Sequence, residues 1–60
     1  MPFVNVKVAG NLNNEQKKQI TKGITELLTD VAGKPASSTY ILIEEHDREN
    51  WGVGGKLLSE

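Results

Sequence analysis

Proline at position 2 is the residue of this chain with the most distinctive chemistry. Methionine aminopeptidases remove an initiator methionine that precedes a small residue, and loss of Met1 would leave Pro2 with a free secondary amine. An α-amino group titrates near pH ~8 in peptides, and burial in an apolar pocket lowers its pKa further. A neutral amine near pH 7 is a competent general base for moving protons on a carbon next to a carbonyl. The alternative is that Pro2 is an ordinary second residue without a chemical role.

Two other segments have the composition of a functional site but not the arrangement. Residues 44 to 47 read Glu-Glu-His-Asp, but successive residues of a strand point to opposite faces, so these side chains do not converge on one metal ion. Residues 52 to 55 read Gly-Val-Gly-Gly, without the preceding strand and following helix of a phosphate-binding loop. We therefore predict no metal site and no cofactor, and interpret the glycine-rich segment as a flexible arm that folds on a neighbour.

The sequence predicts a strand directly after Pro2 and a helix after that strand. Residues 3 to 8 alternate with the period of a strand and place Val4, Val6 and Val8 on one face. The chain then turns, and Asn13 with Gln16 three residues later predicts the beginning of a helix through a variant of the capping box. Gly33 suits a left-handed position after the last helical turn, and Pro35 cannot continue the helix.

The helix has one apolar stripe and one unusual glycine. Apolar side chains recur with a period of 3.6 residues on a single face, formed by Ile20, Ile24, Leu27, Leu28 and Val31. Lys22 and Glu26 are spaced for a modest ion pair on the polar side. Gly23 costs about 1 kcal/mol relative to alanine in a helix, so we expect it to mark a close approach to another backbone.

Residues 39 to 45 predict a second, buried strand, because they are rich in β-branched and aromatic types. Two strands joined by a helix form a βαβ unit, whose strands are parallel and whose crossover is right-handed. The remaining residues, 46 to 60, are expected to form a small hairpin or an extended arm. The predicted fold class is therefore α/β (α+β), with a single βαβ domain over residues 1 to 60.

Length and composition indicate self-association. The chain has 60 residues and no cysteine, and a single copy of this size buries only about 60% of its surface on folding. Disulfides cannot compensate, and an exposed sheet edge beside the uncovered side chains of Tyr40, Leu42 and Trp51 would suit a second subunit. We therefore expect a homo-oligomer.

Charge and hydropathy exclude several classes of partner. Seven basic against eight acidic residues leave no positive surface for nucleic acid. No run of residues is long and apolar enough for a membrane helix, and the first residues lack the pattern of a signal peptide. The expected location is therefore the cytoplasm, without nucleic-acid or membrane partners.

The combination of these features resembles the 4-oxalocrotonate tautomerase family. The residues that carry the resemblance are the Met-Pro start, the Glu-Gln-Lys segment at 15 to 17, Pro35 after the helix and the Trp-Gly-Val-Gly-Gly arm at 51 to 55. It covers essentially the whole chain. It implies a βαβ subunit that pairs into a four-stranded dimer, commonly three such dimers in a hexamer, with each active site completed by neighbouring subunits.

The resemblance also implies roles for individual residues. Pro2 would be the catalytic base, which takes a proton from an enol or an unsaturated 2-oxo acid and returns it to another carbon. Trp51 stands at the position of the pocket aromatic, which is usually phenylalanine. Apolar pocket walls correspond to Val8 and Val53, and Ser38 corresponds to a polar position near the site.

Two positions depart from the family pattern. Well-known members bind the carboxylates of the substrate with two arginines, where this chain has Leu12 and Tyr40. Leucine cannot replace the charged fork of an arginine, and tyrosine supplies a single hydroxyl. We therefore expect a substrate less acidic than that of those members. Arg48, Tyr40 or Lys7 would take part of the oxyanion role, unless Arg48 is simply a solvated turn residue.

Three functions agree with these residues. The first is a cofactor-free tautomerase of enols or 2-oxo acids with Pro2 as general base. The second is a hydratase or dehalogenase in which a protonated Pro2 donates to carbon, and the third is a non-catalytic oligomeric scaffold. The pH profile distinguishes the two roles of Pro2. Activity rises with pH if the neutral amine acts as a base, and it falls with pH if the protonated amine acts as an acid.

Overall fold

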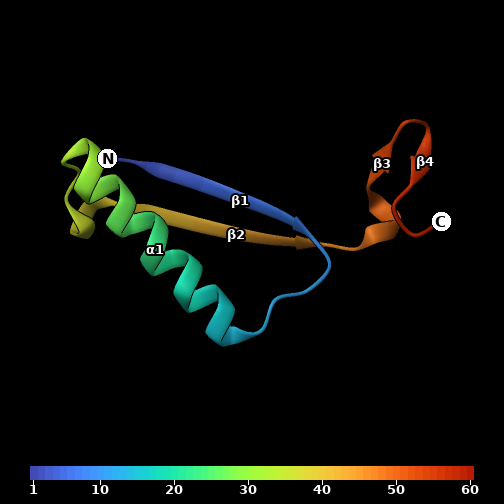
Figure 1. Cartoon of the computed structure of the whole chain (residues 1–60), viewed down its shortest axis with the longest axis horizontal. Coiled ribbons are helices and arrows are strands. Elements are labelled where there is room, and N and C mark those ends of the chain that lie inside the picture. Colours follow the sequence, from blue (N-terminus) through green and yellow to red (C-terminus); the bar gives the residue numbers. More distant parts are fainter.

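The computed structural model describes residues 1 to 60, and they form a βαβ unit followed by a small hairpin (Figure 1). Strand β1 (Phe3–Ala9) pairs in parallel with β2 (Tyr40–His46), in a register that runs from Phe3 opposite Tyr40 to Ala9 opposite His46. The parallel arrangement is confirmed. Each predicted strand is displaced by one residue at most at its ends, which is ordinary fraying of strand boundaries.

Helix α1 (Asn14–Ala32) begins and ends as its caps predict. The Asn13 side chain accepts a hydrogen bond from the Gln16 amide at 2.8 Å, and the Gln16 side chain accepts one from the Asn13 amide at 2.9 Å. Gly33 lies in the left-handed region with φ 65°, and its amide donates to the Thr29 carbonyl. A short 3-10 helix, η1 (Ala36–Ser38), then leads into β2, and it was not anticipated.

One face of the sheet packs against α1 and the other is open. The side chains of Val4, Val6 and Val8 are half-buried on the helix side, and the residues between them are exposed. On the open face Phe3, Tyr40 and Leu42 are 61%, 55% and 44% exposed. No residue of the chain is fully buried. A single copy therefore lacks a core of its own.

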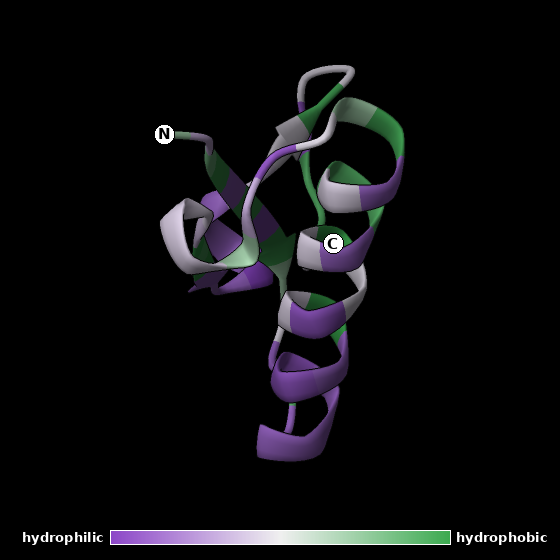
Figure 2. Cartoon of the chain, turned by 90° about the vertical axis from the view of Figure 1, so that its left-hand side faces the viewer, coloured by the Kyte–Doolittle hydropathy of each residue, from purple (hydrophilic) through white to green (hydrophobic).

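The apolar stripe of α1 is only partly covered. Its half-buried members are Ile20, Ile24 and Leu28, whereas Leu27 and Val31 remain 59% and 79% exposed. Figure 2 shows hydrophilic residues at the beginning of the helix and hydrophobic ones toward its end and along the strands. The apolar surface thus continues past the sheet onto the open side of the helix.

The expectation of a close contact at Gly23 is wrong within the chain. Gly23 is exposed, and a Cβ atom built on it would meet nothing within 4 Å. The predicted pair on the polar side does form, with Lys22 Nζ 3.9 Å from Glu26 Oε1. Helix α1 is not long and apolar enough to cross a membrane.

The last part of the chain is an arm that projects from the body (Figure 1). It starts with the 3-10 helix η2 (Arg48–Asn50) and continues as the antiparallel strands β3 (Gly52–Val53) and β4 (Lys56–Leu57). Gly54 and Gly55 form the turn with positive φ angles of 60° and 86°, which glycine adopts without steric cost. The arm extends the molecule to 42 Å in its longest dimension.

Candidate active site

Pro2 lies at the free end of the sheet, immediately before β1. It is half-buried, whereas Met1 before it is 86% exposed. The alternation of burial along β1 places Pro2 on the same side as Val4, toward the helix. With Met1 in place the proline nitrogen belongs to a peptide bond and has no basicity. Removal of Met1 would create the amine at a partly sheltered position.

Two other predicted site residues lie at this same end of the sheet. The Tyr40 amide donates to the Pro2 carbonyl at 2.9 Å, so the start of β2 fixes the position of Pro2. The Tyr40 side chain, however, belongs to the open face together with Phe3, opposite to the side of Pro2. Ser38 closes η1 and its hydroxyl donates to the Pro35 carbonyl at 3.2 Å. The Tyr40 hydroxyl of the same chain is therefore not directed at Pro2.

Val8 and Leu12 lie toward the opposite end of the strands. Both are half-buried, and Val8 is the register partner of Glu45. One oxygen of Glu45 accepts a hydrogen bond from the Leu12 amide at 2.9 Å, and the other lies 2.6 Å from Lys17 Nζ. Hydrogen bonding to Lys17 and then to the Leu12 amide lowers the pKa of the Glu45 carboxyl below its usual value. Glu45 thus anchors the loop that presents Leu12, a role that was not predicted.

The arm holds the remaining candidates, Arg48, Trp51 and Val53. Arg48 is exposed and takes part in none of the ion pairs of the chain. Val53 is 67% exposed, and Trp51 is half-buried. The indole Nε1 of Trp51 is buried and has no hydrogen-bond partner. A buried donor without a partner costs about 1 to 3 kcal/mol, so this tryptophan is not fully satisfied within one chain.

A polar cluster at the base of the arm was also missed by the sequence reasoning. His46 Nε2 lies 3.2 Å from one oxygen of Glu44, and the other oxygen accepts a hydrogen bond from the Asn5 amide group at 3.0 Å. The hydrogen bond from Asn5 and then that with His46 lower the pKa of the Glu44 carboxyl below its usual value. The signal was the spacing of Glu44 and His46, since residues two apart share one face of a strand. Glu45 points to the other face, as the alternation predicts.

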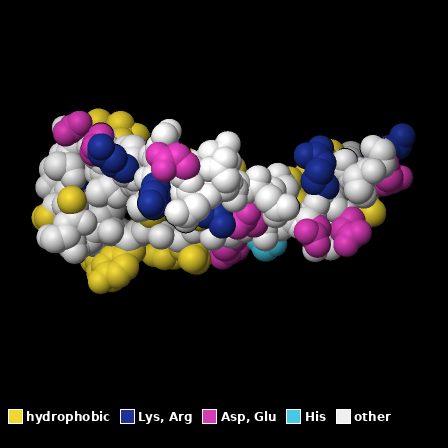
Figure 3. Space-filling view, turned by 90° about the horizontal axis from the view of Figure 1, so that it is seen from below, with side chains coloured by type: hydrophobic (Ala, Val, Ile, Leu, Met, Phe, Trp, Pro, Cys, Tyr) yellow, Lys and Arg dark blue, Asp and Glu magenta, His cyan; other side chains and the backbone are white.

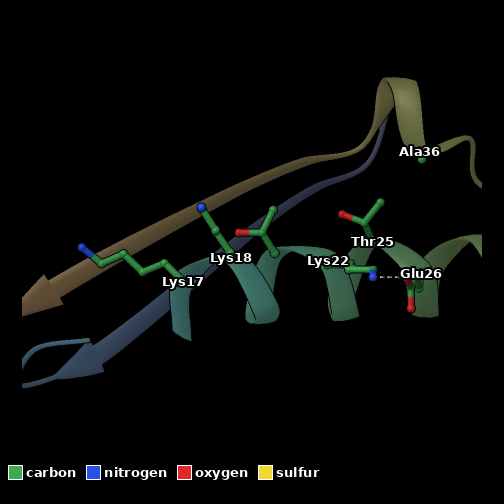
Figure 4. Close-up of a pocket in the computed structure, with 7 residues that line it drawn as sticks. Lys17, Lys18, Lys22, Thr25, Glu26 and Ala36 are labelled. Carbon is green, nitrogen blue, oxygen red and sulfur yellow. Dashed lines mark ion pairs between the residues drawn. The ribbon is translucent and has the colours of Figure 1, made fainter. Parts of the chain in front are cut away.

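One copy does not bring the candidate residues together. The amino-terminal end of the sheet, with Pro2, lies at one end of the molecule and the arm at the other (Figure 1). The one hollow on the surface is an open depression of about 550 Å³, and no predicted site residue lines it. Figure 4 shows that its walls are side chains along α1 and at η1, namely Lys17, Lys18, Thr21, Lys22, Thr25, Glu26 and Ala36. A site that combines Pro2 with Trp51 therefore requires a second copy.

Comparison with known proteins identifies relatives along the whole chain. The family model described as "Tautomerase enzyme" matches residues 2 to 60. A protein of Dickeya dadantii named as a probable tautomerase is 43% identical over 61 residues, which cover 100% of this chain and 91% of the relative. The 2-hydroxymuconate tautomerase of Comamonas testosteroni is 31% identical over 60 residues, covering 100% of this chain and 95% of that protein.

The fold agrees with a solved structure of similar length. The crystal structure of the Helicobacter pylori protein DmpI superposes with a TM-score of 0.91 and 34% sequence identity. The match covers 97% of this chain and 91% of that one. The βαβ unit and the arm therefore occur together in a protein that has been observed experimentally.

Proposed function

The chain belongs to the tautomerase enzyme family, and from that premise we propose that it moves protons on enols or unsaturated 2-oxo acids with Pro2 as the general base. The amine becomes available when Met1 is removed. It takes a proton from the enol hydroxyl or from a carbon next to the carbonyl, and the resulting Pro2 ammonium returns that proton to another carbon of the same molecule. Substrate and product are isomers, so the reaction needs no cofactor.

The position of Pro2 is the observation that carries this proposal. It leads β1, it is half-buried, and its carbonyl is fixed by the Tyr40 amide at 2.9 Å. A base held on a strand keeps its direction through successive cycles, and partial burial disfavours its cationic form. These features suit a neutral amine at pH 7.

A neighbouring subunit would supply the rest of the pocket. Trp51, Val53 and Arg48 lie on an arm that projects from the sheet and meets it through the contact of Trp51 with His46, and a second copy could bring that arm to Pro2. The exposed Phe3, Tyr40 and Leu42 supply apolar surface for the association. We propose a homo-oligomer, with the hexamer as the expected form, whose subunit contacts enclose each Pro2.

The substrate is proposed to carry less negative charge than a dicarboxylate. Leu12 and Tyr40 provide no cation, and Lys7 is the register partner of the carboxylate Glu44 on the open face. Arg48 has no ion pair and shares its arm with Trp51. We therefore favour Arg48 as the group that stabilises the developing enolate oxygen, with one carboxylate or none elsewhere on the substrate.

Replacement of the proline is the direct test. In protein whose intact mass shows that Met1 is absent, Pro2→Ala puts a primary amine without the rigid ring in place of the secondary amine, and the misplaced base is expected to lower kcat/KM for phenylenolpyruvate about 100-fold. Ser37→Ala, on the exposed part of η1, is the matched control and should leave the rate unchanged. Retention of Met1 in the native host, or a Pro2→Ala variant with full activity, would contradict the proposal.

The pH profile separates the alternative reactions. A base must be neutral, so tautomerase activity should rise with pH through the titration of the amine. Hydration or dehalogenation by a protonated Pro2 would fall over the same range. Absence of activity on the whole panel of 2-hydroxydienoates and enols by fully processed protein would favour the non-catalytic scaffold, which the missing arginines motivate.

A further inference from the structure

The base of the arm contains a continuous chain of polar and aromatic contacts. It runs from the Asn5 side chain on β1 through the Glu44 carboxylate to the His46 ring at the end of β2, over distances of 3.0 and 3.2 Å. The His46 ring then meets the indole of Trp51 edge-on, with ring centres 6.1 Å apart and planes at 70°. Figure 3 shows the single histidine beside carboxylates, close to the point where the body narrows into the arm.

Trp51 has few other means of being held in place. Its indole N–H donates to nothing, and its backbone is fixed by hydrogen bonds that remain within the arm, to Arg48 and Leu58. His46 is its aromatic contact in the chain. A two-stranded hairpin is marginally stable by itself, so its direction depends on the contacts at its base. The contact with His46 is thus the link between Trp51 and the sheet.

The strength with which His46 is held between Glu44 and Trp51 depends on whether its imidazole is protonated. The charge of an imidazole changes between about pH 5 and pH 8. A protonated His46 and the Glu44 carboxylate form an ion pair, whereas a neutral ring can donate a hydrogen bond to the carboxylate without the attraction between opposite charges. The other charges near this point are Lys7, the register partner of Glu44, and the residues Asp47, Arg48 and Glu49 at the start of the arm. None of these forms an ion pair with His46.

We propose that His46 is a positioning residue for Trp51, and that its contacts with Glu44 and with the indole hold the arm in the direction needed to close the pocket of a neighbouring subunit. The arm is held more firmly when the imidazole carries a charge than when it is neutral. The consequence for catalysis rests on the proposed function, because it assumes that Trp51 lines the pocket of Pro2. The contact itself does not depend on that assumption.

The composition of the chain makes the contact directly observable. It has one tryptophan and one histidine, so the indole emission of the assembled protein reports on a single site. We expect a single step in emission over the range in which an imidazole changes charge, about pH 5 to pH 8. His46→Gln, which keeps a hydrogen-bonding group but cannot titrate in this range, should abolish the step. Glu44→Gln should reduce its amplitude by more than half, because the ring is no longer held by a carboxylate.

The matched control is Asp47→Asn, which removes the carboxylate next to His46 that is not bonded to it. It should leave the step unchanged. A step that persists in His46→Gln, or wild-type emission that is constant over this range, would overturn the proposal. Should His46→Gln fail to assemble, the wild-type protein still decides the question by NMR. A proton contact between imidazole and indole that weakens as pH rises would support it, and a contact independent of pH would overturn it.

Kinetics then separates this inference from the proposed function. His46→Gln should raise KM more than it lowers kcat, and the variant should lose one limb of the pH profile while keeping the limb due to Pro2. Pro2→Ala should lower turnover but retain the emission step. Loss of the step with normal kinetics in His46→Gln would show that the arm does not serve the pocket, whereas a persistent step in that variant would reject the positioning role.

Discussion

At the scale of single residues, the proposed oxyanion role falls on Arg48, because this chain has Leu12 and Tyr40 where the resemblance to the family implies arginines. It is exposed, it is free of ion pairs, and the arm that carries it also carries Trp51. A guanidinium offers a permanent charge and a planar fork of donors, which suit an enolate or a carboxylate. Nothing else on the arm supplies both properties, because Lys56 offers only a point charge.

We therefore predict that Arg48→Ala lowers kcat/KM for a 2-oxo acid about a hundredfold, the effect of losing one charge-assisted contact of roughly 2.7 kcal/mol. Arg48→Lys should recover part of the loss. The control is Lys56→Ala on β4, which removes a positive charge from the same arm. If Arg48→Ala has the same kinetics as the wild type on every acid and enol tested, Arg48 is a solvated turn residue without a role in the reaction.

The limits of sequence reasoning are clearest at this scale. The position of Pro2 before a strand follows from its neighbours in sequence, and so does the spacing of Glu44 and His46 on one face. The contact of His46 with Trp51 depends on how η2 redirects the chain, which no local pattern encodes. The same applies to the Leu12 amide, whose partner Glu45 is 33 residues away along the chain.

At the scale of elements, Glu45 connects the beginning of α1 to the end of β2. Its carboxylate meets Lys17 of the helix and the amide of the preceding loop, and its side chain is 26% exposed. Because its pKa is lowered in the folded chain, principally by the hydrogen bond from Lys17, the folded state favours the ionised form. That stabilisation is complete above the usual carboxyl pKa and is lost as pH falls through the lowered value.

Glu45→Gln is therefore expected to lower the melting temperature at pH 7, with a difference from the wild type that shrinks toward pH 3. Thermal unfolding followed by circular dichroism at both pH values measures this. The control is Glu49→Gln, since Glu49 is exposed and forms no ion pair. An equal difference at both pH values would mean that the carboxylate acts by packing and not by charge.

The helix offers a second test, at Gly23. Nothing lies within 4 Å of a Cβ atom at this position, so the intrinsic preference of alanine should prevail. Gly23→Ala is predicted to raise the free energy of unfolding by about 1 kcal/mol. Gly33→Ala serves as the contrasting variant, because its φ of 65° disfavours any side chain. A destabilised Gly23→Ala would indicate that a neighbouring subunit approaches the helix here.

The helix and strands were more predictable from the sequence than the way they pack against one another. Caps such as Asn13 and Gln16 act within a few residues, so the boundaries of α1 follow from the sequence. Alternation reveals the first strand, and the β-branched and aromatic composition of residues 39 to 45 reveals the second. Which residues of the apolar stripe contact the sheet depends on how the helix packs in the tertiary structure. The sequence places Leu27 and Leu28 on one face, yet in the structure Leu28 is half-buried and Leu27 is exposed.

At the scale of the whole molecule, the open face of the sheet leaves apolar side chains uncovered in a single copy. No residue is buried in one copy, and the side chains of Phe3, Tyr40 and Leu42 present apolar surface to solvent. Burial of one such side chain contributes about 1.5 to 3 kcal/mol, and an oligomer repeats each contact in every copy. Folding and association should therefore be a single process.

Leu42→Asp is predicted to abolish this process, because it would place an unpaired charge in the contact. Sedimentation at micromolar concentration should give a multiple of the 6.6 kDa chain for the wild type and an unfolded monomer for the variant. The melting temperature of the wild type should also fall on dilution, since association stabilises only the folded form. Thr21→Asp, on the polar face of α1, is the control for added charge. A folded monomer of either protein would show that the βαβ unit is stable alone, and the origin of the pocket would then have to be sought within one chain.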